Sequence, residues 1–274
     1  MTQTVQLGPL VLSLPLLMGI AAFLIAGWTG RRLGKDQAAE VDRQLLRTVL
    51  VGLVVARLAF VVQFRDAYLK SPLGILDIRD GGWHAAIGVG AALAYAGVVL
   101  VRRAALRKPL AAAVAMGAGV WLAGALVLSA NTPDDVRMPQ LALPAIDGTT
   151  VALSSYEGRP TVVNFWATWC PPCQREMPML YAAQRSRPDV NFVFLNQGES
   201  AQQVVAYLRR SGLALQNVLL DGRSEAGVAL GHRALPTTLF FDARGRLVDT
   251  RQGELSEASL AERLGTLSPT TQKQ

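Results

Sequence analysis

Four long apolar stretches in the first half of the chain constrain its fold more than any other feature. Each approaches the roughly 20 residues that a helix needs to cross a bilayer. The first nine residues contain no lysine or arginine, so the first stretch lacks the basic start of a signal peptide and is interpreted as a retained span. We therefore expect residues 1–130 to form an all-α membrane domain of four helices, with Pro15 kinking the first. The stretches are Leu10–Trp28, Val49–Phe64, Trp83–Val101 and Leu110–Ala130.

Basic residues between these stretches predict the orientation of the membrane domain. Residues 1–130 hold 13 basic and 6 acidic side chains and residues 131–274 hold 14 of each, so the formal charge of +7 belongs to the first half. Charge placed between apolar stretches indicates membrane orientation and argues against a nucleic-acid-binding patch. The first and third loops carry nine bases and the second loop carries three. Because basic loops stay cytoplasmic, both chain ends are predicted outside, in the periplasm beyond a bacterial inner membrane.

The second stretch contains a charge, Arg57, which makes it the weakest of the four spans. An arginine at the middle of a span costs ~2.5–3.5 kcal/mol on insertion scales, and neighbours such as Leu58 and Phe60 offset that cost. If this stretch stayed outside the bilayer, the two basic loops would merge on one side, so four spans remain the better account. We interpret Arg57 as facing a partner helix or an internal polar group, and His84 as an interfacial residue.

Part of this region resembles the prolipoprotein diacylglyceryl transferase family of membrane enzymes. Val55–Phe60 is similar to the family's G-R-L-G-Y segment, with both glycines replaced, and Asp80–His84 is similar to a D-G-G-M-S-F-H-G-G run shortened by two residues. The likeness covers about residues 10–100 and lacks the family's later arginine- and asparagine-bearing motifs. The likeness therefore implies a membrane scaffold related to that family, and it gives less support to a lipid-transfer activity.

After a polar linker, residues 131–137, the sequence alternates between strand and helix patterns. Thr161–Trp166 is rich in β-branched and aromatic residues, which is typical of a buried strand. It leads through Cys170–Cys173 into a helical segment, Gln174–Gln184, in which Pro178 is an expected kink. The pattern predicts an α/β domain with a mixed central sheet over residues 138–274. The other expected elements are strands at Gln140–Leu143, Thr149–Leu153, Asn191–Asn196, Val218–Leu220, Thr237–Asp242 and Leu247–Thr250, and helices at Ala201–Arg210 and Glu257–Leu264.

The chain's two cysteines, Cys170 and Cys173, stand where this strand gives way to the helix. A thiolate is a better nucleophile than a thiol, and a helix N-terminus favours the thiolate through its unpaired N–H groups and its dipole. Pro171 and Pro172 suit a first turn because neither offers an N–H donor. We expect Cys170 at the exposed tip and Cys173 one turn on, within disulfide reach. Cys170 would then attack a disulfide and Cys173 would resolve the mixed disulfide.

A metal site is the alternative interpretation of the same cysteines. A structural zinc site uses four protein ligands, yet the chain has no other cysteine and two histidines, His84 and His232. Copper handling by Cys170, Cys173 and His232 is the most specific form of this alternative. We expect no metal and no cofactor beyond the redox-active Cys170–Cys173 disulfide, and we interpret His232 as a surface residue.

Residues 162–178, V-V-N-F-W-A-T-W-C-P-P-C-Q-R-E-M-P, closely resemble the signature of the TlpA-like thiol–disulfide oxidoreductases of the thioredoxin superfamily. The likeness extends over about residues 138–266 and includes Leu235-Pro236-Thr237-Thr238. It implies an α/β thioredoxin-like fold in which Pro236 is a cis-proline opposite the disulfide. The residue before that proline would present its backbone to a bound substrate.

The resemblance also implies roles for residues near the cysteines. Glu176 matches an acidic residue that manages protons near the buried thiol, and its alternative is an ordinary first-turn glutamate that complements the helix dipole. Asn164 stands where thioredoxin has a buried aspartate, so proton handling by that aspartate is absent here. Trp166 and Trp169 are expected to pack the strand and flank the cysteines, with Trp169 the better candidate for a substrate-facing surface.

Together these features predict a membrane-anchored periplasmic thiol–disulfide oxidoreductase that reduces protein disulfides, in cytochrome c maturation or metallocentre assembly by the resemblance. An oxidase or isomerase remains the alternative direction, and the other classes are a metal chaperone and a lipid-related membrane module with an accessory redox domain. Residues 1–130 contain no cysteine, so such a reductase would depend on a separate transmembrane thiol relay. The expected partners are protein thiols or disulfides, that relay and the membrane, without nucleic acid.

Overall fold

Helices make up most of the first half of the chain, as the apolar stretches predict. The computed structural model describes residues 4–7, 10–70, 72–77, 80–130, 136–232 and 234–267. Contacts divide the chain into one unit of residues 1–75 and 82–132 and a second of residues 76–81 and 133–274. Most of the predicted linker, residues 131–135, lies outside the described residues.

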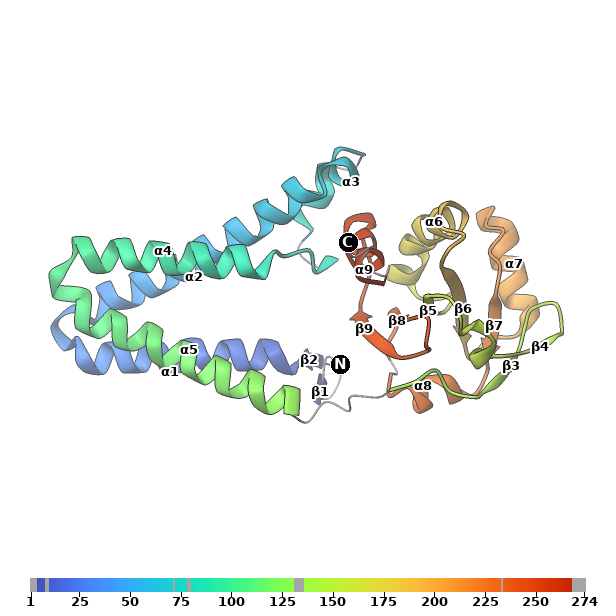
Figure 1. Cartoon of the computed structure of the whole chain (residues 1–274), viewed down its shortest axis with the longest axis horizontal. Helices are drawn as coiled ribbons and strands as arrows, with labels where there is room; N and C mark the ends of the chain where they lie inside the picture. The colour runs from blue at the N-terminus through green and yellow to red at the C-terminus, as the bar shows by residue number, and fades with distance from the viewer. Residues whose placement is uncertain are drawn as a thin grey trace, which may run out of the picture. The chain divides into compact units, whose positions relative to one another are not determined.

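Four helices among the described residues are long and apolar enough to cross a membrane. In the first unit, α1 packs mainly against α5 and α2 mainly against α4 (Figure 1). A Cβ on Gly88 of α4 would lie 2.6 Å from the Cβ of Ala56 on α2, so the lack of a side chain lets these two helices approach closely. The helices are α1 (Leu14–Leu33), α2 (Ala38–Gln63), α4 (Ala85–Arg102) and α5 (Arg107–Ala130), with short elements η1 (Lys35–Gln37), α3 (Arg65–Lys70), η2 (Pro72–Leu76) and η4 (Ala104–Leu106) between them.

The helix bounds differ from the predicted spans. Residues before the first helix form β2 (Leu10–Ser13), which pairs antiparallel with β1 (Thr4–Leu7), so the helix does not include them. Pro15 consequently lies in the first turn of α1, where its missing N–H removes no intrahelical hydrogen bond, and not in mid-helix. The second helix begins at Ala38, well before the predicted Val49. The polar residues between Ala38 and Val49 extend toward the N-terminus the helix that the apolar residues form.

Arg57 lies in the last third of α2, and not at the middle of a span as the predicted bounds implied. Its side chain is 7% exposed. The guanidinium donates hydrogen bonds to the main-chain oxygens of Gly74 (2.9 Å), Ile75 (3.1 Å) and Gly82 (2.9 Å), and it lies 5.2 Å from the ring of Tyr68. A buried cation and the main-chain carbonyls of η2 and of Gly82, just before α4, therefore satisfy one another. The expected internal polar partner of Arg57 is the peptide backbone.

A sheet of five described strands, in the order β7-β6-β5-β8-β9, forms the second unit. β5, β6 and β7 run parallel, and β8 and β9 are antiparallel to their neighbours, so the predicted mixed sheet is confirmed. The short antiparallel pair β3 (Ala142–Pro144) and β4 (Thr150–Ala152) precedes the sheet. The strands of the sheet are β5 (Thr161–Trp166), β6 (Asn191–Gln197), β7 (Val218–Asp221), β8 (Thr237–Phe241) and β9 (Leu247–Gln252).

Alternate side chains of the central strand enter two apolar clusters. Val162 and Trp166 of β5 pack in the cluster that contains the cysteines, and Val163 and Phe165 pack in the other. Residues of α6 (Pro171–Ser186), α7 (Ala201–Ser211) and α9 (Glu257–Leu267) join the first cluster, and residues of α8 (Glu225–Ala229) join the second (Figure 1). The sequence did not predict α8, since five residues are too few for helical periodicity to show. Pro178 lies inside α6, which continues past it.

Replacing Arg57 by leucine should loosen the segment that it holds. Each buried carbonyl left without its donor costs roughly 1–3 kcal/mol. We expect Arg57→Leu, measured in detergent, to speed hydrogen exchange in peptides that contain Gly74, Ile75 and Gly82. Arg65→Leu is the matched control, because the Arg65 side chain is 77% exposed. Equal exchange in Arg57→Leu and the unaltered chain would contradict the holding role.

Candidate functional site

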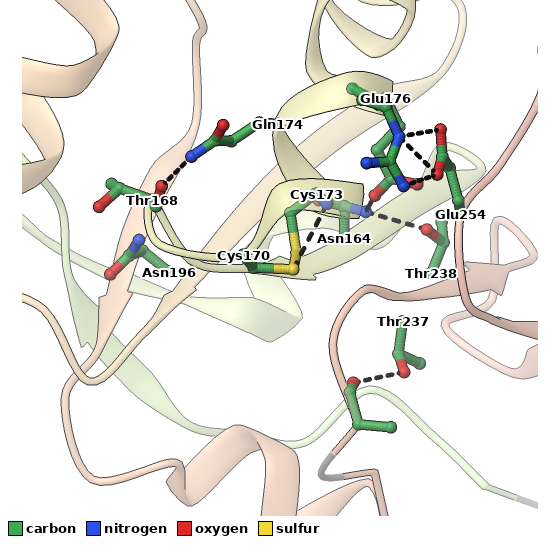
Figure 2. The surroundings of a disulfide bond; sticks show 12 residues. Asn164, Thr168, Cys170, Cys173, Gln174, Glu176, Asn196, Thr237, Thr238 and Glu254 are labelled. Atoms are coloured by element: carbon green, nitrogen blue, oxygen red, sulfur yellow. Dashed lines mark hydrogen bonds and ion pairs between the residues drawn. A yellow bond between two sulfur atoms is a disulfide. The ribbon is translucent and has the colours of Figure 1, made fainter.

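The two cysteines lie where β5 ends and α6 begins, and they form a disulfide with Cα atoms 5.3 Å apart. Cys170 is the N-cap residue of α6, and Pro171 and Pro172 are the first two residues of that helix. The N–H of Cys173 points at the Sγ of Cys170 from 3.4 Å (Figure 2). The N-terminal end of a helix therefore faces the Cys170 sulfur, an arrangement that stabilises a thiolate at this position.

Both cysteines are buried, so the prediction that Cys170 sits at an exposed tip is wrong. Cys170 is 4% exposed and Cys173 is fully buried. They pack in one apolar cluster with Trp166 of β5 and Met177 of α6. The apolar residues at the end of the strand and the start of the helix close around the loop between them, which leaves only a small part of Cys170 open to a partner.

Trp169 and Pro236 lie on the two segments next to the disulfide. Trp169 immediately precedes Cys170 in the sequence and is 66% exposed. The Leu235–Pro236 peptide bond is cis, and Pro236 is buried. Pro236 comes directly before β8, whose first residue, Thr237, is paired with Phe165 of β5. The sheet register therefore brings the cis-proline to the end of β5 from which the disulfide loop departs.

Glu176 is buried inside the domain, with 1% of its surface exposed. Its Oε1 accepts a hydrogen bond from Asn164 Nδ2 (2.8 Å), and its Oε2 accepts one from the N–H of Leu255 (2.9 Å). Burial raises the pKa of Glu176 to about 7, although both hydrogen bonds favour the charged form. The alternative of an ordinary first-turn glutamate is therefore wrong. This carboxyl group can gain or lose a proton near neutral pH.

Asn164 links that carboxyl group to the strand that follows the cis-proline. Its Nδ2 also donates to the hydroxyl oxygen of Thr238 on β8, over 3.0 Å (Figure 2). The side chain is 1% exposed, and within the described part of the chain its Oδ1 has no hydrogen-bond partner. One amide group therefore connects β5, α6 and β8 at the level of the disulfide, and it carries no charge of its own.

A second carboxylate, which no local sequence pattern marks, holds the loop before Cys170. Glu199, between β6 and α7, accepts hydrogen bonds from the N–H of Thr168 (2.7 Å), from the Thr168 hydroxyl and from Asn196 Nδ2 (2.8 Å). Gln174 of α6 donates to the Thr168 carbonyl oxygen (Figure 2). Thr168 is thus held by two side chains, Glu199 and Gln174, next to Trp169. No local pattern marks Glu199, because it lies 31 positions from Thr168.

His232 is also buried, with 6% exposed, so its prediction as a surface residue is wrong. Its N–H donates to the Gly227 carbonyl oxygen (2.8 Å), which folds the residue inward. Neither ring nitrogen has a hydrogen-bond partner among the described residues, and burial lowers the pKa of the ring. The described residues hold no group of three histidine, cysteine, aspartate or glutamate side chains that could bind a metal ion. In the disulfide form, Cys170 and Cys173 offer no thiolate to copper.

Known proteins similar to the second half are thiol–disulfide oxidoreductases. Residues 133–264 match the Redoxin family. ResA of Geobacillus thermodenitrificans is 30% identical over 134 residues, covering 48% of this chain and 76% of that protein. ResA of Halalkalibacterium halodurans is 32% identical over 127 residues, covering 45% of this chain and 71% of that protein. The chain belongs to this family of thiol–disulfide oxidoreductases. The predicted TlpA-like resemblance and the oxidoreductase class are confirmed.

The first half of this oxidoreductase has a different relative. Residues 3–131 match the prolipoprotein diacylglyceryl transferase family, which confirms the resemblance and extends it beyond the predicted residues. With its four apolar helices, this half makes the oxidoreductase a membrane protein. Among solved structures, DsbF of MTB, in mixed oxidized and reduced forms, is 27% identical, with a TM-score of 0.45 over 47% of this chain and 96% of that one.

The buried Glu176 should make the stability of the oxidised protein depend on pH. Because folding raises its pKa from 4.5 to about 7, the folded chain binds a proton that the unfolded chain releases between these values. The resulting stability is fully present below pH 4.5 and is lost as pH rises through 7, by up to about 3 kcal/mol. Glu176→Gln should flatten the fall in melting temperature between pH 5 and pH 8, whereas Glu262→Gln, a control whose side chain is 41% exposed, should keep it. An unchanged fall in Glu176→Gln would contradict the raised pKa.

Proposed function

We propose that this protein is a membrane-anchored reductase of protein disulfides that works in the periplasm of a bacterium. One observation carries the proposal: a Cys170–Cys173 pair at a helix N-terminus lies close to a buried carboxyl group that titrates near neutral pH. Such a pair can hold two electrons as thiols and release them to another disulfide. Cytochrome c maturation and metallocentre assembly both need reduced protein thiols in that compartment, and they are the settings we favour.

In the first step, the Cys170 thiolate attacks one sulfur of a substrate disulfide. The substrate S–S bond breaks, its second sulfur leaves as a thiolate and takes a proton from water, and Cys170 becomes joined to the substrate. The α6 N-terminus favours the thiolate form of Cys170 in the reduced protein through its dipole and the N–H of Cys173. Cys170 is the nucleophile in this proposal because it is the N-cap residue and retains some exposure.

In the second step, Cys173 attacks the Cys170 sulfur and releases the reduced substrate. Cys173 is fully buried, so its proton needs an acceptor inside the protein. Glu176, on the next turn of α6, accepts that proton as a carboxylate. The Cys170–substrate bond breaks, the substrate sulfur leaves as a thiolate, and the Cys170–Cys173 disulfide forms. Two electrons have then passed from the cysteine pair to the substrate.

Substrate contacts come from the two segments beside the disulfide. Trp169 offers a large exposed aromatic surface, and Thr168 holds it in place through Glu199. The cis-peptide before Pro236 leaves the backbone of Leu235 as the proposed site for pairing with an extended substrate segment. A substrate is therefore recognised through its backbone and one aromatic contact, which suits several protein clients.

Trapping experiments should separate the roles of the two cysteines. Cys173→Ser cannot complete the second step, so it should accumulate mixed disulfides with substrates through Cys170. Cys170→Ser lacks the nucleophile and should accumulate few. Mixed disulfides are counted on non-reducing gels, and mass spectrometry identifies the linked proteins. Equal trapping by the two variants, or alkylation of Cys173 before Cys170 in the reduced protein, would reverse the assignment.

Electrons must reach this pair from outside the chain. Residues 1–130 contain no cysteine to carry them across the bilayer. We infer that a separate transmembrane thiol relay reduces the Cys170–Cys173 disulfide, docking near Trp169. The basic first and third loops support a periplasmic location for the second half. If these loops stay in the cytoplasm, both ends of the membrane domain lie on the periplasmic side of the membrane. An oxidising compartment also requires such a resupply of electrons.

Thiol labelling in whole cells tests orientation and electron supply together, because the chain has no other cysteines. A membrane-impermeant maleimide should label the steady-state protein as fully as a permeant one. Deleting the cell's thiol-relay proteins should abolish labelling, since the pair then stays oxidised. The Cys170→Ser/Cys173→Ser double variant gives the background. Labelling by the permeant reagent alone contradicts the periplasmic location, and undiminished labelling without relays contradicts the electron supply.

A further inference from the structure

A short segment after β9 contacts two groups of the site. Gly253, Glu254 and Leu255 follow one another between β9 and α9. The N–H of Gly253 donates to the carbonyl oxygen of Pro236 (2.8 Å), and the N–H of Leu255 donates to Oε2 of Glu176 (2.9 Å). Gly253 has a φ of 87°, a conformation that glycine adopts without strain and that turns the chain between these contacts. The 253–255 segment thus connects the cis-proline with the buried carboxyl group.

Glu254, the middle residue of this segment, is paired with Arg175 on α6. Nε of Arg175 lies 3.1 Å and 3.0 Å from the two carboxylate oxygens of Glu254, and a terminal nitrogen lies 2.5 Å from one of them. A forked pair of this kind fixes orientation as well as distance. Arg175 directly precedes Glu176. The ion pair therefore fastens the 253–255 segment to α6 next to the buried carboxyl group.

We propose that Arg175 and Glu254 are positioning residues for the redox reaction, because their ion pair keeps the N–H of Leu255 on the Glu176 carboxylate. The inference rests on the proposed function, in which Glu176 accepts the proton of Cys173. Without the ion pair the segment keeps only the Gly253–Pro236 hydrogen bond and the burial of the Leu255 side chain, and the Leu255 N–H moves away from the carboxylate. Glu176 then stays protonated at neutral pH and is no longer available as a proton acceptor.

Charge alone gives a different expectation from positioning. The charged groups that act on the pKa of Glu176 are Glu254 in the segment, which raises it, and Arg251 on β9, which lowers it. Arg175 is adjacent to Glu176 in the sequence, and its guanidinium is paired with Glu254. If the ion pair acted through charge alone, Glu254→Gln would lower the pKa of Glu176 and Arg175→Gln would raise it. Positioning predicts that both substitutions raise it, because each removes the same ion pair. The direction of the shift in Glu254→Gln therefore separates the two explanations.

The test uses the reduced full chain in detergent and follows its oxidation by oxidised glutathione as a function of pH. We expect Arg175→Gln and Glu254→Gln each to move the Glu176 inflection upward by about one pH unit. Deuterium uptake at the Leu255 amide should become about tenfold faster in both. Arg175→Lys, which keeps the charge but not the fork, should shift the inflection less. The matched control is Arg187→Gln, which breaks a forked pair with Asp189 at the other end of α6 and should change neither quantity.

Glu176→Gln distinguishes failure of the inference from failure of the proposed function. If Glu176 carries the proton, this variant loses the inflection. An inflection that survives overturns the proton-carrying role on which the inference rests. A different outcome overturns the inference alone. In that outcome Glu176→Gln loses the inflection, but the two ion-pair variants leave it unmoved or move it in opposite directions. Unchanged uptake at Leu255 in the ion-pair variants overturns it as well.

Discussion

A carboxyl group that is buried away from solvent needs hydrogen-bond donors from the protein. The redox site is arranged around one such group, Glu176. Its two oxygens are met by the side chain of Asn164 and by the backbone of Leu255. Asn164 also binds Thr238, so one buried acid ties together β5, α6, β8 and the segment after β9. Burial opposes ionisation and the donors favour it, and the balance leaves the pKa at about 7. The same contacts that hold these elements together therefore decide when the acid can exchange a proton.

The membrane half also contains a buried ionisable side chain, and this one is a cation. Arg57 is withdrawn from solvent, and main-chain carbonyls of the segment after α3 receive its hydrogen bonds. A charged residue that weakened the second span in the sequence thus holds the short η2 helix and Gly82 against that span. Both halves use one buried ionisable side chain to hold backbone that lies outside the long helices and the central sheet.

Local patterns predicted the parts of the site that are close in sequence. Thr161–Trp166 was found with its observed bounds because β-branched and aromatic residues mark a buried strand, and the cysteine pair follows directly. Contacts made over long separations could not be found this way. Leu255 lies 79 positions from Glu176 and Glu199 lies 31 from Thr168, and neither has a local signal. The burial of Cys170 and His232 was missed for the same reason, since exposure depends on which distant elements cover a loop.

The low exposure of Cys170 limits which molecules can exchange electrons with the cysteine pair. Because Cys170 is 4% exposed, its sulfur reacts with a disulfide that protrudes or lies on a flexible strand of its partner. Two copies of this chain each present a recessed sulfur, so a collision between them brings no sulfur into line with another. We therefore expect direct electron exchange between reduced and oxidised copies to be slow. Each molecule keeps its two electrons until a partner of suitable shape arrives.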